Sequence, residues 1–415
     1  MFKNKVRNIL ILGNLAMISL CIYVWTRSKA RDIRYHSVIK SVSGSSSVGY
    51  SSPRHRGHVL SQNRTFPRGG DSLTFDQPWQ ITPIKVFTSF DKLDKNVKYI
   101  VSNFTYSPGL GNLMFQFASL RALAVQHKAT LILPSNCLLR RAFAPLTLTH
   151  NDSGVVFVKA TVVDRYLKDH KGITVNDCCR YNANISVFNA EYEKDLPQVA
   201  VVNGYFQSYK YFSPEYTGFI KKAFTFLPHV VGAADAILEN AKFKNWNNDL
   251  KQDEEQGNDI VVQLPEEFSS DYFYVGIHVR HGIDLTMHSR NIKHGHVVAP
   301  GDYYSRAMKY FVDKITHKKV IFVVASDDLP WVRKTFVSNV PGQFIFVNSG
   351  HREVDLATLT LCNASIISTG TFSWWSGWLN RGTEVVYFKD WPASDSQLAA
   401  QVDKDDYFPS SWIAM

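Results

Sequence analysis

The chain has 415 residues, of which 45% are hydrophobic and 20% charged, and it contains 27 Phe, 19 Tyr and 9 Trp. This composition is too apolar and aromatic for a disordered protein, and the length is sufficient for two domains. The net charge of +10 is concentrated at one end, because residues 1–70 hold twelve Lys or Arg and a single acid, Asp32. The rest of the chain therefore sums to a charge of −1, which excludes the large basic surface of a duplex-binding protein.

Residues 8–26 form a run of nineteen residues without a charge, with basic residues beyond both ends. As a helix this run would be about 28 Å long, close to the ~30 Å hydrocarbon core of a bilayer. Tyr23 and Trp25 lie where aromatic residues gather at a membrane interface. The alternative is a cleaved signal peptide, but the following residues are bulky and then basic and lack a small-x-small cleavage site. We therefore expect an uncleaved anchor after a short tail, residues 1–7.

The charges that flank this anchor do not decide its orientation, since basic residues occur on both sides. A short tail ahead of a large folded remainder favours a cytoplasmic N-terminus and a lumenal folded part. Residues 27–95 carry the run SVSGSSSVGYSSPRHRG and little apolar periodicity, which predicts a flexible stem. Five Asn-x-Ser/Thr sequons fit a lumenal location, and they lie at Asn63, Asn103, Asn151, Asn184 and Asn363.

Cys21 falls within the predicted anchor, which leaves Cys137, Cys178, Cys179 and Cys362 for the folded part. In an oxidising lumen four thiols suggest two disulfides. A bond between the adjacent Cys178 and Cys179 is not expected, so two of the three pairings stay open, with buried free thiols as the alternative. The spacing lacks the paired C-x-x-C ligands of a zinc site.

From residue 98 onward, apolar β-branched runs alternate with helix-like stretches. Strands are predicted at 98–104, 130–134, 198–206, 272–280, 320–326, 344–348, 364–370 and 384–388. Amphipathic stretches such as 302–315 and 353–362 lie between strands. Continuous apolar strands that alternate with helices predict parallel sheets with both faces covered. We expect two doubly wound α/β halves, 96–265 and 266–415, with a ligand in the crevice at the strand ends.

Glycine and polar residues gather at four of the predicted strand ends. At the first, PGLGN (108–112), Gly109 and Gly111 would let the backbone approach a phosphate or sugar at a helix N-terminus. The alternative is a tight turn that packs the helix onto the strand. The segment is not a G-x-G-x-x-G motif, and the sequence contains no P-loop.

The second strand end, GIHVRHGID (276–284), directly follows an apolar strand. Alternation places His278 and Arg280 on one face of the sheet, with Arg280 at the end of the strand. The planar fork of Arg280 suits a diphosphate, because it donates two charge-assisted hydrogen bonds. The alternative is a structural ion pair.

The other two strand ends carry acids and hydroxyls. In VASDDLPW (324–331), Asp327 or Asp328 either caps the next helix or accepts hydrogen bonds from the ring N–H groups of a guanine. STGTFSWWSGWLN (368–380) opens a helix with hydroxyl side chains, a second anion site, and its tryptophans are predicted to be core. The four ends together predict a pocket for a nucleoside diphosphate.

Taken together, these segments resemble the galactoside α-1,2-fucosyltransferases (glycosyltransferase family 11), which transfer fucose from GDP-fucose to galactose. The resemblance is carried by PGLGNLMFQFASLRALA, NGYFQSYKYF, VGIHVRHGID, FVVASDDLPWVRK and DLATLTLCNASIISTGTFSWWSGWLN. It implies two Rossmann-like domains of the GT-B type, with the acceptor on the N-terminal half and GDP-fucose on the C-terminal half. It also implies a single-pass type II protein of the Golgi membrane, β-galactoside-terminated glycans as acceptors, and no metal or other cofactor.

The donor site implied by the resemblance comprises Gly109, Gly111, Asn112, His278, Arg280, Asp327, Thr371 and Ser373. In it, His278 faces the guanine or ribose, Arg280 binds the β-phosphate and Asp327 accepts from the guanine. Thr371 and Ser373 touch the phosphates.

The chain departs from the family's H-x-R-R-G-D motif at two positions. The second arginine is His281, and Ile283 separates Gly282 from Asp284. Neutralisation of the phosphates therefore depends more heavily on Arg280, which places the activity of the chain in question.

GDP-fucose is β-linked and the implied product α-linked, which indicates a single displacement with inversion. Such a reaction needs a base near the acceptor hydroxyl, for which Asp284 is the first candidate and His288 the second. The D-x-D at Asp403–Asp405 is interpreted as surface in a polar C-terminal tail. Two alternatives stay open: a fucosyltransferase with another acceptor, such as N-glycan core GlcNAc or a protein hydroxyl, and a non-catalytic GDP- or glycan-binding relative.

Overall fold

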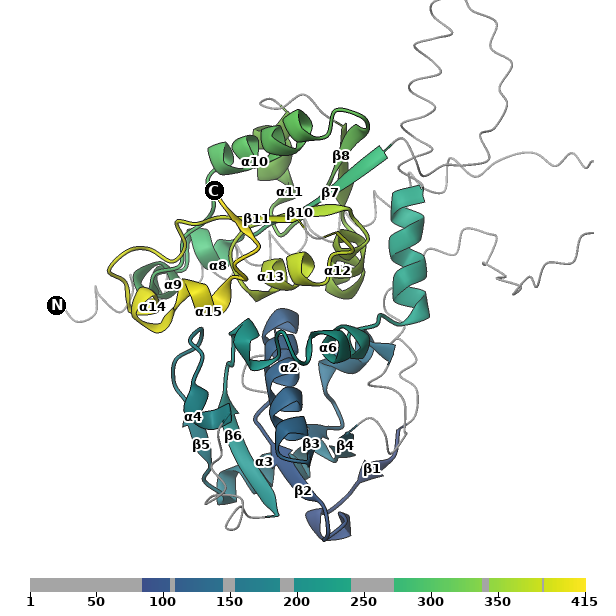
Figure 1. The fold of residues 1–415 in the computed structure, drawn as a ribbon, viewed down its shortest axis with the longest axis vertical. Helices are drawn as coiled ribbons and strands as arrows, with labels where there is room; N and C mark the ends of the chain where they lie inside the picture. Colours follow the sequence, from purple (N-terminus) through teal and green to yellow (C-terminus); the bar gives the residue numbers. More distant parts are fainter. Residues whose placement is uncertain are drawn as a thin grey trace, which may run out of the picture. The chain divides into compact units, whose positions relative to one another are not determined.

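The structure is a computed structural model that describes residues 84–104, 109–144, 154–186, 198–239, 272–337, 343–382 and 384–415. These residues belong to one compact unit, 73–415, and form two six-stranded sheets (Figure 1). The predicted tail and anchor, the predicted stem up to residue 83 and the predicted division between residues 265 and 266 lie outside the described residues. Within the described ranges, no helix is long and apolar enough to cross a bilayer.

The first sheet has the strand order β1-β4-β3-β2-β6-β5, and its pairs are parallel. Its strands are β1 (Val86–Phe87), β2 (Lys98–Val101), β3 (Ala129–Pro134), β4 (Val155–Val158), β5 (Ile173–Val175) and β6 (Val199–Gly204). Ile100 of β2 packs into the main core, whereas Tyr99 and Val101 pack with Val163 of α3 (Ala160–Asp169) in a second cluster. Because both faces are covered, β2 is apolar at successive positions.

The second sheet has the order β12-β11-β10-β7-β8-β9 and is also parallel. Its strands are β7 (Tyr272–Val279), β8 (Lys319–Ser326), β9 (Gln343–Val347), β10 (Ala364–Ile367), β11 (Glu384–Tyr387) and β12 (Ile413–Ala414). Figure 1 shows α10 (Gly301–Lys314) on one face of this sheet and α12 (Arg352–Thr360) and α13 (Thr371–Trp378) on the other. Helix α11 (Leu329–Val337) packs on β8 and α10. This half is doubly wound, as predicted.

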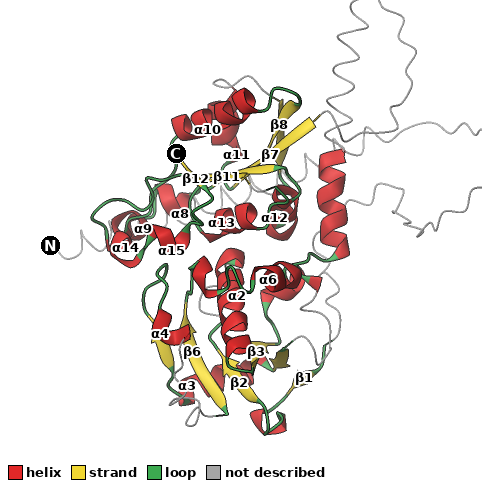
Figure 2. Cartoon of the chain, viewed as in Figure 1, coloured by secondary structure: helices red, strands yellow, loops and turns green. Residues whose placement is uncertain are grey.

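The remaining helical elements lie mainly in the connections between strands (Figure 2). They include α2 (Leu110–Gln126), α4 (Ala183–Ser186), α6 (Thr217–Ala223), α8 (Ile283–Thr286), α9 (Ser289–His294), α14 (Gln397–Gln401), α15 (Lys404–Tyr407), η1 (Phe90–Lys92), η2 (Leu138–Arg141) and η5 (Tyr209–Tyr211), and residues 228–239 are also helical. The eight predicted strands are present, whereas the short strands β1, β4, β5 and β12 were not predicted. The fold also begins before the predicted boundary at residue 96, since Leu93 is buried and β1 pairs with β4.

The two halves meet where the N-terminus of α2 packs against the N-terminus of α13 (Figure 1). Gly111 allows this approach, because a Cβ there would lie 2.5 Å from backbone atoms at the start of α13. Trp375 Nε1 donates a hydrogen bond to the carbonyl oxygen of Gly111 at 3.0 Å. Phe115 packs against Trp374 and Trp375, with ring centroids 4.5 and 5.0 Å away. One core therefore runs through both halves.

The C-terminal segment, residues 397–408, follows the second sheet in sequence but also binds the first half. The Asp406 carboxylate accepts hydrogen bonds from Lys210 Nζ at 2.6 Å and from the backbone N–H of Tyr181 at 2.7 Å. Ser208 Oγ donates to the carbonyl oxygen of Asp406 at 2.7 Å. The segment that was predicted as a polar tail therefore links the halves, although Asp403 and Asp405 themselves are exposed, as expected.

The expectation that Cys178 and Cys179 do not bond to each other was wrong, whereas the alternative of buried free thiols holds for the other two cysteines. Cys178 and Cys179 are bonded to each other, whereas Cys137 and Cys362 are buried free thiols. Cys137 precedes η2 in the first half, and Cys362 packs against β7 of the second sheet, so the fold keeps these two thiols in different halves. Burial raises the pKa of the Cys137 thiol to about 11 and also raises that of Cys362, so both thiols stay protonated.

We expect Gly111→Ala to lower the free energy of unfolding by about 1–3 kcal/mol, because the added Cβ must push the backbones of α2 and α13 apart. Urea denaturation of the purified protein measures this change. Gly218→Ala in α6 is the matched control, since a Cβ at Gly218 meets no atom within 4 Å. A Gly111→Ala protein as stable as the parent would contradict the close packing of the two helices.

Candidate active site

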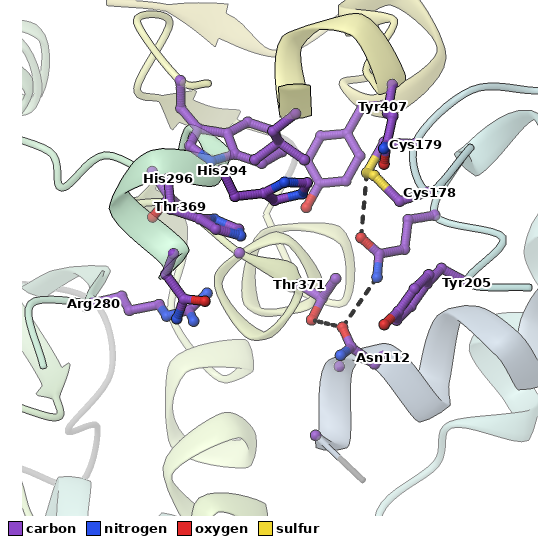
Figure 3. Close-up of a pocket in the computed structure, with 18 of the residues that line it drawn as sticks. Asn112, Cys178, Cys179, Tyr205, Arg280, His294, His296, Thr369, Thr371 and Tyr407 are labelled. Atoms are coloured by element: carbon purple, nitrogen blue, oxygen red, sulfur yellow. Dashed lines mark hydrogen bonds between the residues drawn. A yellow bond between two sulfur atoms is a disulfide. The ribbon is translucent and has the colours of Figure 1, made fainter. Parts of the chain in front are cut away.

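A pocket of about 1280 Å³ is lined by residues from both halves, at the ends of β6, β7 and β10 (Figure 3). Small-molecule sites usually measure roughly 300–1,000 Å³, so this pocket has room for more than one ligand group. Among the predicted site residues, those that line the pocket are Gly109, Gly111, Asn112, Arg280 and Thr371. Those that do not line it are His278, Asp284, His288, Asp327 and Ser373.

Asn112 joins the two walls of the pocket. Its Oδ1 accepts a hydrogen bond from Thr371 Oγ1 at 2.7 Å and another from Gln207 Nε2 at 3.1 Å (Figure 3). Asn112 belongs to the first turn of α2, Thr371 opens α13, and Gln207 follows β6. These two bonds set the orientation of the Asn112 amide, and they hold the helix N-termini of both halves at the pocket wall.

Arg280 lies directly after β7, and its side chain reaches the pocket (Figure 3). Its backbone N–H donates to Ser368 Oγ at 3.1 Å, and its guanidinium pairs with the Asp284 carboxylate. Gly370 has a φ of 88°, and a Cβ at this position would lie 2.5 Å from Arg280 Nη1. Glycine is therefore required at 370 both for the backbone conformation and for the space that the guanidinium occupies.

The two candidate bases, Asp284 and His288, do not lie in the pocket wall. Asp284 pairs with Arg280, and its carbonyl oxygen accepts from Asn291 Nδ2 at 2.8 Å. His288 is exposed and precedes α9 without a side-chain cap hydrogen bond. Because neither side chain lines the pocket, the geometry favours Asp284 as a group that orients Arg280, and the assignment of a base stays a prediction.

The pair Asp327–Asp328 binds the chain after β7. Asp327 Oδ1 accepts from the backbone N–H of His281 at 2.7 Å, and Asp328 Oδ2 lies 2.9 Å from His281 Nδ1. The imidazole of His281 also stacks on Trp331, with ring centroids 4.1 Å apart. Hydrogen bonding by His281 lowers the pKa of Asp328. His281, which stands at the position of the family's second arginine, thus joins β7 to α11 and lies off the pocket wall.

His278 and Ser373 lie behind the pocket wall. The His278 ring packs on Phe372 with centroids 4.7 Å apart, and burial together with the charge of Arg280 lowers its pKa to about 3. Ser373 is fully buried, and its Oγ accepts from the backbone N–H of Ser368 at 2.8 Å. In this structure the Ser373 hydroxyl therefore holds the turn between β10 and α13.

Sequence analysis did not identify several residues of the pocket wall. They include Tyr205, Gln207, His294, His296, Trp391 and Tyr407. Four cations line the pocket, namely Arg280, Arg290, Lys293 and Arg352, against one carboxylate, Asp395. This excess of positive charge favours an anionic ligand. Within the described ranges, no group of three or more His, Cys, Asp or Glu side chains could hold a metal ion.

A family model described as glycosyl transferase family 11 matches residues 187–415, more than half of the chain. The O-antigen biosynthesis glycosyltransferase WbnK of Escherichia coli is 31% identical over 141 residues, which cover 33% of this chain and 43% of that protein. Galactoside alpha-(1,2)-fucosyltransferase 1 of Bos taurus is 31% identical over 145 residues, which cover 34% of this chain and 39% of that protein. The chain thus matches less than half the length of these relatives. A solved structure of POFUT1 in complex with GDP-fucose aligns with a TM-score of 0.44 at 12% identity, covering 71% of this chain and 99% of that chain.

We expect the protein to lose stability as the pH falls from 7 to 5. Burial, together with the charge of Arg280, lowers the pKa of His278 to about 3 and that of His296 to about 4. Because both values lie below the ~6.5 of an unfolded histidine, the unfolded state binds more protons at acidic pH, and each histidine lowers the free energy of unfolding by about 2 kcal/mol at pH 5.

Urea denaturation at pH 7 and pH 5 measures this loss. The free energy of unfolding should differ less between pH 7 and pH 5 in His278→Gln than in the parent. The exposed control His317→Gln should show the parental difference. An equal pH dependence in the parent and in His278→Gln would show that folding does not lower the pKa of His278.

Proposed function

The chain belongs to glycosyl transferase family 11, and we propose that it transfers L-fucose from GDP-fucose to the 2-hydroxyl of a terminal galactose on a glycan. The observation that carries this proposal is Arg280, whose guanidinium lies on the wall of a positively charged pocket within the family-matched region. Relatives that are 31% and 29% identical over part of their length are named galactoside alpha-(1,2)-fucosyltransferases, which supports galactose as the acceptor.

Cleavage of the bond between fucose and the β-phosphate builds positive charge on the sugar and negative charge on GDP. A cation that is already in place stabilises the leaving group without reorganising during the reaction. Arg280 meets this requirement, because Asp284 and the backbone at Gly370 hold its guanidinium at the pocket wall. We propose that Arg280 binds the β-phosphate and that the reaction requires no metal.

The two walls of the pocket suit two substrates. Arg280 and Thr371 come from the second half, which would hold GDP-fucose, whereas Tyr205 and Gln207 come from the first half, which would hold the acceptor. In a single displacement the acceptor hydroxyl approaches the sugar from the face opposite to GDP. Opposing walls allow this approach, and the product of the β-linked donor would then be α-linked.

We further propose that the chain is a single-pass type II protein of the Golgi membrane with a lumenal active site. The uncharged run at residues 8–26 supports an anchor. Among the sequons, Asn184 and Asn363 are exposed and Asn103 is partly buried, whereas Asn63 and Asn151 lie outside the described residues. Exposed sequons are available to the lumenal glycosylation machinery.

The assay that tests the function incubates the purified protein with GDP-fucose and a panel of β-galactosides in the presence of EDTA. We expect a fucosylated product with an α-1,2 linkage, identified by mass spectrometry and linkage analysis. A strict requirement for added Mn²⁺ would contradict the role given to Arg280. A product on another sugar or on a protein hydroxyl would overturn the proposed acceptor.

In the same assay we expect Arg280→Lys to lower the turnover rate by about 10²–10³-fold, because lysine keeps the charge but loses the planar fork. Arg306→Lys is the matched control, since Arg306 also pairs with an aspartate four residues away but lies on the exposed side of α10. Near-parental turnover of Arg280→Lys would show that the phosphate is bound elsewhere.

The topology predicts that full-length protein in microsomes is N-glycosylated and that its folded part is protected from added protease. A chain that starts near residue 60 behind a signal peptide should be secreted in a soluble, glycosylated and active form. An unglycosylated microsomal protein with a protease-accessible C-terminus would overturn the topology.

A further inference from the structure

Four polar atoms in the pocket wall are buried and have no hydrogen-bond partner among the described residues. They are His296 Nδ1, Thr369 Oγ1, Trp391 Nε1 and Tyr407 Oη. Three of these side chains are almost completely buried, with 3% of Thr369, 3% of Trp391 and 1% of Tyr407 exposed. Because more than about 90% of buried polar groups in folded proteins are paired, four unpaired atoms in one wall indicate a place for a polar ligand.

The four residues and Arg280 line one pocket. The Trp391 and Tyr407 rings are in contact, with centroids 5.2 Å apart. His296, Trp391 and Tyr407 line the same pocket as the Arg280 side chain. Thr369 is adjacent to Gly370, the residue against which the guanidinium lies. Figure 3 shows His296 and Thr369 beside Arg280, with the Tyr407 ring near His294.

The four atoms differ in hydrogen-bonding character. Trp391 Nε1 only donates, whereas the hydroxyls of Thr369 and Tyr407 can both donate and accept. Burial and the charge of Arg280 lower the pKa of His296 to about 4, so its imidazole is neutral near pH 7 and carries one donor and one acceptor nitrogen. A second phosphate group would use only the donors. A sugar hydroxyl uses both kinds, so the mixture of donors and acceptors fits a sugar better than a second phosphate.

We propose that His296, Thr369, Trp391 and Tyr407 form the subsite for the sugar ring of the nucleotide sugar, next to the diphosphate position at Arg280. This inference rests on the proposed function, because Arg280 is placed at the β-phosphate, and the sugar is bonded directly to that phosphate. Tyr407 of the C-terminal segment and Trp391 in the loop after β11 therefore help to select the sugar that is transferred.

The test compares the dissociation constants of GDP and GDP-fucose by isothermal titration calorimetry. In Tyr407→Phe and in Thr369→Val, we expect the ratio of the constant for GDP-fucose to that for GDP to rise about three- to tenfold above the parental ratio, the effect of one lost hydrogen bond. Binding of GDP itself should be unchanged, because the guanine and phosphate contacts remain. Retained GDP binding also shows that the variants are folded.

The melting temperature separates a ligand-binding role from a structural one. Removal of a buried hydroxyl without a partner should leave the melting temperature of ligand-free Tyr407→Phe unchanged or raised. Tyr310→Phe is the matched control, because the Tyr310 hydroxyl donates a hydrogen bond to Glu384 and neither residue lines the pocket. The ratio of its dissociation constants for GDP-fucose and GDP should equal that of the parent.

An unchanged ratio in both pocket variants would overturn the sugar subsite. A lowered melting temperature together with an equal loss of GDP and GDP-fucose binding would also overturn it, by showing a structural role for the hydroxyl. If the parent binds GDP and GDP-fucose but forms no product with any galactoside, the proposed acceptor fails, whereas the ratio still decides the subsite. A parent that binds neither nucleotide would overturn both proposals.

Discussion

The close approach of α2 to α13 is the constraint on which the pocket depends. It requires a residue without a side chain at Gly111, and the bond from Trp375 to the Gly111 carbonyl holds the two helices in that position. Nearly every residue of α2 is buried, because one side packs on the first sheet and the other on α13. A helix that is apolar on all sides is typical of such a buried position. The consequence is that strand ends of both sheets open into one pocket.

Arg280 is the second organising element, because it lies at the pocket wall and its charge adds to burial in lowering the pKa of two histidines. The guanidinium is partly buried, and the Asp284 carboxylate pairs with it. The same charge, added to burial, keeps His278 and His296 neutral. The pocket therefore combines one oriented guanidinium with neutral hydrogen-bonding groups. The guanidinium suits the diphosphate of a nucleotide sugar, and the neutral groups suit the hydroxyls of its sugar.

The predicted site residues fall into two groups: those that line the pocket and those that hold the loops beside it. Asn112, Arg280 and Thr371 line the pocket. Asp327 and Ser373 instead bind backbone N–H groups that hold the loops after β7 and β10. Motif similarity identifies a position near the strand ends, but a short polar side chain there can bind either a ligand or its own loop. The local backbone conformation decides whether the side chain binds a ligand or its own loop. The pattern of residue types does not specify that conformation.

The sequence by itself determined the alternation of strands and helices, the parallel sheets and the cation at the end of β7, because hydrophobic periodicity and strand-end chemistry are local properties. The tertiary structure decided which distant segments meet. It bonded Cys178 to Cys179, and it brought Trp391 and Tyr407 to the pocket from segments after β11. Such contacts depend on the simultaneous packing of both sheets and the C-terminal segment, and no local pattern in those segments specifies them.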